Sequence, residues 1–306
     1  MLRFIIRRLL ITIPTILVVI TLTWGLIRLA PGNFYTGEKS IPRAIRKNIQ
    51  EKYGLNKPWY VQYVTTMGHI VRLDFGNSLK YQGQPVNTII ARSLPVSATV
   101  GLLAYLLALI IGITFGSIAA LKQNSRWDYA SMTLAMLGIS IPNFVLGPLL
   151  VLVFSLSLYW LPPARWNGFW STSLVLPVLT LSGIYMAYIA RLTRAGMLEV
   201  LRSDYIRTAR SKGLRERDVV VRHALRAGLM PVISFTGPAL AFLLTGTVVV
   251  ERIFALPGLG NYFIQASLNR DEPLLIGIVA FIAMTLLLMN LLVDIVYAYL
   301  DPRIRY

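Results

Sequence analysis

The sequence predicts an all-α, polytopic membrane protein with six transmembrane helices. Of its 306 residues, 56% are hydrophobic and only 14% are charged, proportions outside the range of soluble proteins. Six long windows also contain no charged residue, and each is long enough for a helix that crosses about 30 Å of hydrocarbon in about 20 residues. A β-barrel would instead need many short segments of alternating polarity. The windows are Leu9–Ile27, Ser93–Leu121, Tyr129–Ala164, Trp166–Ala190, Ala227–Val250 and Pro273–Val293.

Basic residues predict that both termini lie in the cytoplasm. With this orientation ten Lys and Arg residues lie in the cytoplasmic loop 191–230, whereas the short outer loops carry only Arg165, Arg252 and Arg270. Residues 1–30 form an N-terminal tail and first helix, uncleaved because proline directly follows the only candidate small residue of a signal-peptide cleavage site.

Residues 31–95 are expected to form an extracytoplasmic segment with short amphipathic helices, and residues 96–306 a core of transmembrane helices two to six. This segment holds nine basic and three acidic residues, but at its length the charge rule loses force. Prolines and glycines predict three helices. The first runs from Pro42 to Gly54 and has apolar residues at Ile41, Ile45 and Ile49; the second is opened by Pro58 and has an apolar face of Tyr60, Tyr63, Val64, Met67 and Val71. A turn at 74–78 then precedes the third helix, Pro85–Leu94. A surface cap is the simpler role, and docking of an external partner is the alternative.

The sequence predicts no catalytic residue, no cofactor and no metal site. Cysteine is absent, the two histidines lie in different polar segments, and there is no P-loop, zinc-protease motif or nucleophile elbow. We expect the net charge of +17 to reflect contacts with anionic membrane lipid and the topology of the chain. Binding of nucleic acid is not expected, because no nucleic-acid-binding motif accompanies the charge.

Membrane-embedded charge, which ion-driven carriers use for coupling, is scarce. Arg28, Glu251 and Arg252 lie near helix ends, and Asp294 lies about two turns from the end of the sixth helix. A structural salt bridge or an interfacial position explains Asp294 better than a proton relay does.

The cytoplasmic loop contains the start and stop signals of two helices. Ser203 can cap a first helix, Asp204–Lys212, which Gly213 ends. A second helix is expected to begin near Glu216 and to run toward Pro231. A short helix held outside the membrane suits a groove on another protein.

Motifs in this loop and along the chain carry a resemblance to a known family. They are Asp204–Leu214 in the loop and, elsewhere, Ala30–Gly32, Asp74–Ser78, Pro85–Val86, Arg92–Pro95, Glu251–Phe254, Pro257–Gly260 and Asn269–Asp271. The loop resembles the coupling loop, or EAA motif, of permease subunits of bacterial ABC importers. Arg207 and Thr208 replace the generic Glu-Ala pair, and the generic proline is displaced to Pro231, which favours the dipeptide, oligopeptide and nickel branch.

The resemblance implies the type I ABC importer permease fold, a bacterial inner-membrane location and a role as half of a translocation pathway. It also implies a second homologous permease subunit, two ATP-binding subunits that bind the ATP, an extracytoplasmic substrate-binding protein and a peptide substrate. Contact with the ATPase subunits is expected at Asp204, Tyr205, Arg207, Thr208, Ala209, Arg210, Lys212, Gly213 and Leu214.

Breaks in two helices predict a shielded route for the peptide, whose amides and charged termini cannot cross hydrocarbon unaided. Glycine, proline and asparagine free backbone groups toward a cavity. The expected breaks are Pro142, Asn143 and Pro148, with Gly138 and Gly147, and Gly237 and Pro238, with Gly246. An ion-driven peptide carrier and a non-transporting assembly factor remain open as alternatives, as do nickel and glycan cargoes within the family.

Overall fold

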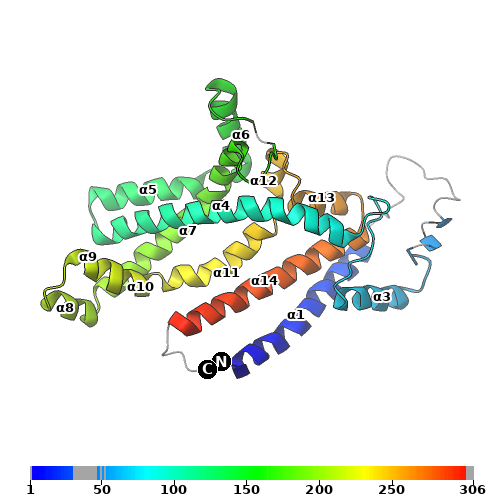
Figure 1. The fold of residues 1–306 in the computed structure, drawn as a ribbon, viewed down its shortest axis with the longest axis horizontal. Coiled ribbons are helices and arrows are strands. Elements are labelled where there is room, and N and C mark those ends of the chain that lie inside the picture. Colours follow the sequence, from blue (N-terminus) through cyan, green and yellow to red (C-terminus); the bar gives the residue numbers. More distant parts are fainter. Residues whose placement is uncertain (1, 30–46, 49, 52, 164, 301–306) are drawn as a thin grey trace.

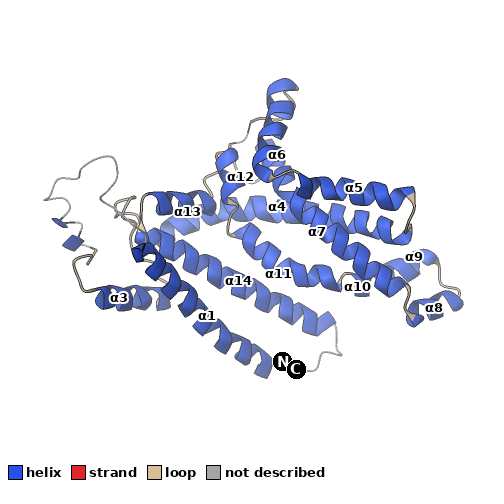
Figure 2. Ribbon diagram, turned by 180° about the vertical axis from the view of Figure 1, so that it is seen from behind, coloured by secondary structure: helices blue, strands red, loops and turns tan. Residues whose placement is uncertain are grey.

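The structure is a computed structural model that describes residues 2–29, 47–48, 50–51, 53–163 and 165–300. The regular elements in these ranges are helices (Figure 2), and Asn77 and Pro85 form an isolated bridge. The all-α prediction is therefore confirmed for the described residues. In chain order the helices are α1 (Leu2–Leu29), α3 (Trp59–Val71), α4 (Val86–Leu121), α5 (Arg126–Ser140), α6 (Asn143–Leu150), η2 (Val151–Ser157), η3 (Thr172–Leu174), α7 (Val175–Leu201), α8 (Asp204–Ser211), α9 (Glu216–Asp218), η4 (Val219–Ala224), α10 (Leu225–Gly228), α11 (Met230–Leu244), α12 (Val248–Ile253), α13 (Leu259–Leu268) and α14 (Glu272–Leu300).

The long helices form an elongated bundle, and short helices gather at its two ends (Figure 1). At one end lie α8 and α9, and at the other lie α3 and α13. We call these the α8 end and the α3 end. In both views the first turn of α1 lies near the last turns of α14.

Four helices are long and apolar enough to cross a membrane, and a bent helix pair would make five. The apolar part of α1, Ile13–Leu29, is shorter than these spans. By length and composition the described residues thus provide four to five candidate spans, fewer than the six predicted windows. The spans are Val86–Leu121, Thr172–Leu201, Met230–Ile253, Glu272–Val296 and the bent pair Arg126–Ser140 with Asn143–Ser157.

Small residues bring α7 into backbone contact with α4 and α5. A side chain at Gly138 on α5 would overlap the backbone of Gly183 on α7, and one at Gly116 on α4 would overlap the backbone at Ala190. Such close approach stabilises helix pairs where lipid is as apolar as the side chains. Around this contact lies the largest buried cluster, to which α4, α7, α11 and α12 contribute Val100, Ala104, Tyr105, Leu181, Ile189, Leu243 and Val250.

The third charge-free window is broken into two helices, as its prolines predicted. α5 ends at Ser140, Ile141 is extended, and Pro142 precedes α6 at a bend of 100°. Proline has no N–H to donate and disfavours the helical conformation of the residue before it, which explains the break. In Figure 1, α6 stands out sideways from the bundle.

The expected third outer helix is wrong in its length. α4 begins at Val86 and continues through Pro95 to Leu121, so Pro85–Leu94 is not a separate helix, and the division at residue 95 falls inside α4. A helix can contain proline where neighbouring groups satisfy the freed backbone carbonyl. At the α3 end, the expectation for Ile41, Ile45 and Ile49 lies outside the described residues, and Gly54 lies in a turn.

The second outer helix is confirmed as α3, but its expected apolar face is split. Tyr63 and Met67 pack against a cluster that includes Trp24 on α1, whereas Tyr60 and Val64 are exposed. Val71 is exposed as well. Packing on a neighbouring helix is therefore observed for Tyr63 and Met67, and a position of the exposed residues at the membrane interface stays a prediction.

Gly138→Ala is expected to lower the thermal stability, because its methyl group would force α5 away from the α7 backbone. The control is Gly25→Ala on α1, where no atom lies within 4 Å of the new Cβ. There alanine should be neutral or stabilising by up to about 1 kcal/mol, its helix preference over glycine. Thermal unfolding in detergent measures both variants, and equal effects would contradict this packing.

Candidate coupling surface and pathway

The first helix of the loop, α8, docks on the bundle through one face. Ile206 and Ala209 are buried and pack against Met197 at the end of α7 and against Val219 and Ala224 on η4. This packing fixes which face of α8 points toward the bundle. The opposite face is exposed.

The structure separates the predicted ATPase-contact residues into an exposed set and a buried one. Ala209 faces the bundle, so it positions α8 and does not lie on the exposed surface. The other eight, which are exposed, are Asp204, Tyr205, Arg207, Thr208, Arg210, Lys212, Gly213 and Leu214.

The turn after α8 is fixed by a glycine and an ion pair. Gly213 has φ +76°, in the left-handed region that disfavours side chains. The Arg210 guanidinium donates to both carboxylate oxygens of Glu216 over 2.7 and 3.1 Å. These hydrogen bonds hold the pKa of the Glu216 carboxyl below its ordinary value, because they favour its ionised form.

Two features of the loop differ from the sequence prediction. The Ser203 hydroxyl does not cap α8, and donates to the Val200 carbonyl over 2.6 Å. The second helix begins at Glu216 as expected but contains the π-helical stretch η4 before α11 begins at Met230. Both differences depend on local hydrogen-bond choices that residue preferences do not determine.

An ion pair missed by the sequence analysis joins α5 to α7 near their α8 ends. Arg194 donates to the two carboxylate oxygens of Asp128 over 2.8 and 2.7 Å, and Asp128 is buried. The Asn124 amide also donates to Asp128 over 2.9 Å. The two residues are 66 positions apart, so no local pattern could pair them.

The predicted helix breaks are only partly observed. Pro142 and Asn143 lie at the bend between α5 and α6, and Pro148 lies inside α6 just before the π-helix η2. Gly237 and Pro238 do not interrupt α11, which is continuous to Leu244, so the expected break at these two residues is wrong. The interruption in this span comes at Gly246, with φ +100°. A role of these residues in a pathway stays a prediction.

Glu251 is a buried carboxylate that ties the two segments after this break to α4. Its oxygens accept from the Ser97 hydroxyl over 2.7 Å and from the Asn261 amide over 3.0 Å. Ser97 in turn accepts from the Leu259 amide over 2.8 Å. A Cβ at Gly258 would overlap the carboxylate, which explains glycine at that position. Glu251 therefore fixes α12 and α13 to α4.

A second buried carboxylate, Asp271, holds the loop between α3 and α4 against the start of α14. It accepts from the backbone amides of Leu79 and Lys80 over 3.0 and 3.1 Å and from the Ser78 hydroxyl. The Leu274 amide donates to it as well over 3.3 Å. Residues far apart in the sequence thus form one rigid α3 end.

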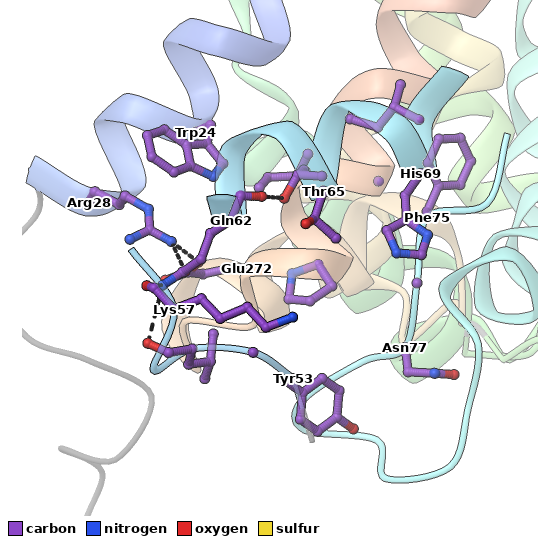
Figure 3. Close-up of a pocket in the computed structure, with 18 of the residues that line it drawn as sticks. Trp24, Arg28, Tyr53, Lys57, Gln62, Thr65, His69, Phe75, Asn77 and Glu272 are labelled. Carbon is purple, nitrogen blue, oxygen red and sulfur yellow. Dashed lines mark hydrogen bonds and ion pairs between the residues drawn. The ribbon is translucent and has the colours of Figure 1, made fainter. Parts of the chain in front are cut away.

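A cavity of about 320 Å³ opens beside this end, between α1, α3 and the start of α14 (Figure 3). Arg28 stacks 4.2 Å from the Trp24 ring, donates to Gln62 and lies 3.7 Å from Glu272. These contacts join the three helices. Within the described residues no group of three or more His, Asp or Glu side chains could hold a metal ion.

Residues 112–306 match the family "Binding-protein-dependent transport system inner membrane component", and residues 1–101 match "Binding-prot-dependent transport system membrane comp, N-term". The chain is 48% identical over its full length to the oligopeptide transport system permease protein OppB of Salmonella typhimurium, all of which is covered. It is 44% identical to the dipeptide transport system permease protein DppB of Bacillus subtilis, with 100% of this chain and 98% of that protein covered.

A solved structure shares the fold. It is the crystal structure of an amino acid ABC transporter with histidines, with a TM-score of 0.53 and 16% identity, covering 70% of this chain and 94% of that one. At this identity the likeness shows the fold alone. The relatives are transport permease subunits, in keeping with the absence of a catalytic motif from the sequence.

Ser97→Ala is expected to lower the thermal stability more than Thr99→Ala on the same helix. The first substitution removes a donor from Glu251 and an acceptor from the Leu259 amide, and a buried group without its partner costs about 1–3 kcal/mol. The Thr99 hydroxyl donates only to its own helix, at the Pro95 carbonyl. Thermal unfolding in detergent compares them, and a smaller loss for Ser97→Ala would refute the anchoring role of Glu251.

Proposed function

Because the chain belongs to the family of binding-protein-dependent transport system inner membrane components, we propose that it is the membrane-spanning permease subunit of an ATP-driven peptide importer. The observation that carries the proposal is full-length identity of 44–48% to proteins named as oligopeptide and dipeptide permeases. The chain forms half of the translocation pathway and leaves ATP chemistry to its partners.

The subunit crosses the bacterial inner membrane six times with both termini in the cytoplasm. The α8 end is the cytoplasmic end, because the basic loop that contains α8 lies there and positively charged loops stay inside. The sixth crossing is α1, whose 28 residues are long enough at 1.5 Å per residue.

The partners are a second homologous permease subunit, two ATP-binding subunits and an extracytoplasmic substrate-binding protein. The ATPase contact is the exposed face of α8, where Tyr205 presents an aromatic ring and Arg207 and Lys212 present charge. A short helix docked by its own buried residues suits a groove on a partner. Closure of the ATP-binding subunits on ATP is then transmitted to the bundle through Ile206 and Ala209.

Uptake of peptide into vesicles that hold the whole complex is expected to require internal ATP and to persist when ion gradients are dissipated at fixed ATP. Asp294→Asn, near the end of α14, should reduce expression but preserve ATP-driven uptake, because an amide retains part of the hydrogen bonding. The purified chain alone should not hydrolyse ATP. Uptake that follows the ion gradient and is abolished in Asp294→Asn would favour an ion-driven carrier.

Gly213→Val is expected to abolish transport while the protein still inserts, because a β-branched residue strains a turn with φ +76°. Gly213→Asn is the matched control, since asparagine tolerates the left-handed region far better. Membrane fractionation and peptide uptake measure the two properties separately. Normal uptake by Gly213→Val would separate this turn from energy coupling.

A further inference from the structure

One face of α7 carries exposed polar side chains at the end of its charge-free stretch. Tyr188 and Arg191, one turn apart on this helix, are exposed. Tyr188 lies in the last turn of the charge-free window 166–190 and Arg191 directly follows that window, both within the candidate span Thr172–Leu201. Tyr185, one turn before Tyr188, is half-buried. The opposite face of α7 packs on α4 through Ile189 and Ala190, so the polar stripe points away from the packed core.

Side chains of the two neighbouring helices extend this stripe into a wall. The Phe235 ring on α11 lies 5.6 Å from the Tyr188 ring and 6.2 Å from the Tyr185 ring. On the other side, the Arg191 guanidinium donates to the Met136 sulfur on α5 over 3.1 Å. We call Met136, Tyr185, Tyr188, Arg191 and Phe235 the α7 wall.

The polar groups of the α7 wall lack the partners that such groups have elsewhere in the bundle. Within the described residues, neither tyrosine hydroxyl donates to an oxygen, and Arg191 has no carboxylate partner. By contrast, Arg194 pairs with Asp128, and the Tyr105 hydroxyl donates to Thr236 over 2.6 Å.

A guanidinium facing hydrocarbon is costly, so charged residues in spans face a water-filled cavity or a protein partner. The exposed side of α4 differs, because its residues Leu102, Leu106 and Ile110 are apolar and suit contact with lipid. The composition of the α7 wall also suits peptides. Phenol hydroxyls hydrogen-bond amides, aromatic rings and the flexible Met136 accept varied side chains, and a guanidinium binds carboxylates.

We infer that the α7 wall lines the translocation pathway and that Arg191 binds the carboxylate of a passing peptide. This inference rests on the proposed importer function and names the surface and the charge that handle its cargo. Arg191 lies toward the α8 end, so it meets the peptide on the cytoplasmic half of its route.

The absence of cysteine from the chain allows a direct test of the wall. Tyr188→Cys, in inverted vesicles holding the complete complex, should react with a membrane-impermeant thiol reagent in the absence of nucleotide. The control is Ile110→Cys, because Ile110 is 67% exposed and lies two residues from Gly112, which contacts α7 at Ile189. It should remain unlabelled. Failure of Tyr188→Cys to react with the reagent, or equal labelling of both variants, would contradict the inference that the α7 wall lines an aqueous pathway.

Peptide protection then tests the role of Arg191. A tripeptide with a free C-terminal carboxylate should slow the labelling of Tyr188→Cys at about tenfold lower concentration than its C-terminal amide, since a hydrogen bond to a charged group is worth at least about one factor of ten. Adding Arg191→Gln should remove that difference, and adding Arg191→Lys should retain part of it. Equal protection by acid and amide would overturn carboxylate binding and would point to an acidic residue of the second permease as the partner of Arg191.

These outcomes are separate from those of the proposed function. Labelling and selective peptide protection without ATP-dependent uptake would contradict the ATP-driven importer and leave the wall in place. ATP-dependent uptake together with an unreactive Tyr188→Cys would support the ATP-driven importer and contradict the role of the α7 wall.

Discussion

The close approach of α7 to α4 and α5 is the contact on which the rest of the structure depends. Lipid provides no hydrophobic force between helices, so their association relies on backbone proximity and packing. Gly138 and Gly183 touch across α5 and α7, and Gly116 receives the backbone at Ala190. With one face of α7 committed to these contacts, its other face is left for Tyr188 and Arg191, and its end is placed where α8 docks.

The α3 end is held by a different device, because two buried carboxylates take the place of close backbone packing. Glu251 and Asp271 each accept hydrogen bonds from a serine hydroxyl distant in sequence and from backbone amides, which for Asp271 are also distant. A buried charge is tolerated only when such partners surround it. These buried hydrogen bonds link separate segments at this end, whereas at the turn of Gly213 an exposed ion pair joins α8 to α9.

Much of the helical plan could be predicted from the sequence, because charge-free windows and proline or glycine punctuation are local signals. The windows locate α4, α7, α11 and α14, and the break at Pro142 follows from the missing N–H of proline. Local signals failed where contacts with other helices determine the structure. Pro95 looked like a boundary but lies inside α4, and Gly237 serves packing against Val293 on α14 and causes no break.

In the candidate site, too, some features follow from local sequence and others only from contacts made in the fold. Exposure of most of α8 follows from its polar composition, but the burial of Ala209 depends on Met197 and Ala224, which only the folded chain brings together. Arg191, Met136 and Phe235 lie on three helices and gave no common sequence signal. Because Arg191 and Met197 belong to the same unbroken α7, the helix on which α8 docks is also the helix that carries Arg191. In the proposed importer, ATP-driven motion and cargo contact therefore share one rigid element, and no flexible joint between them is needed.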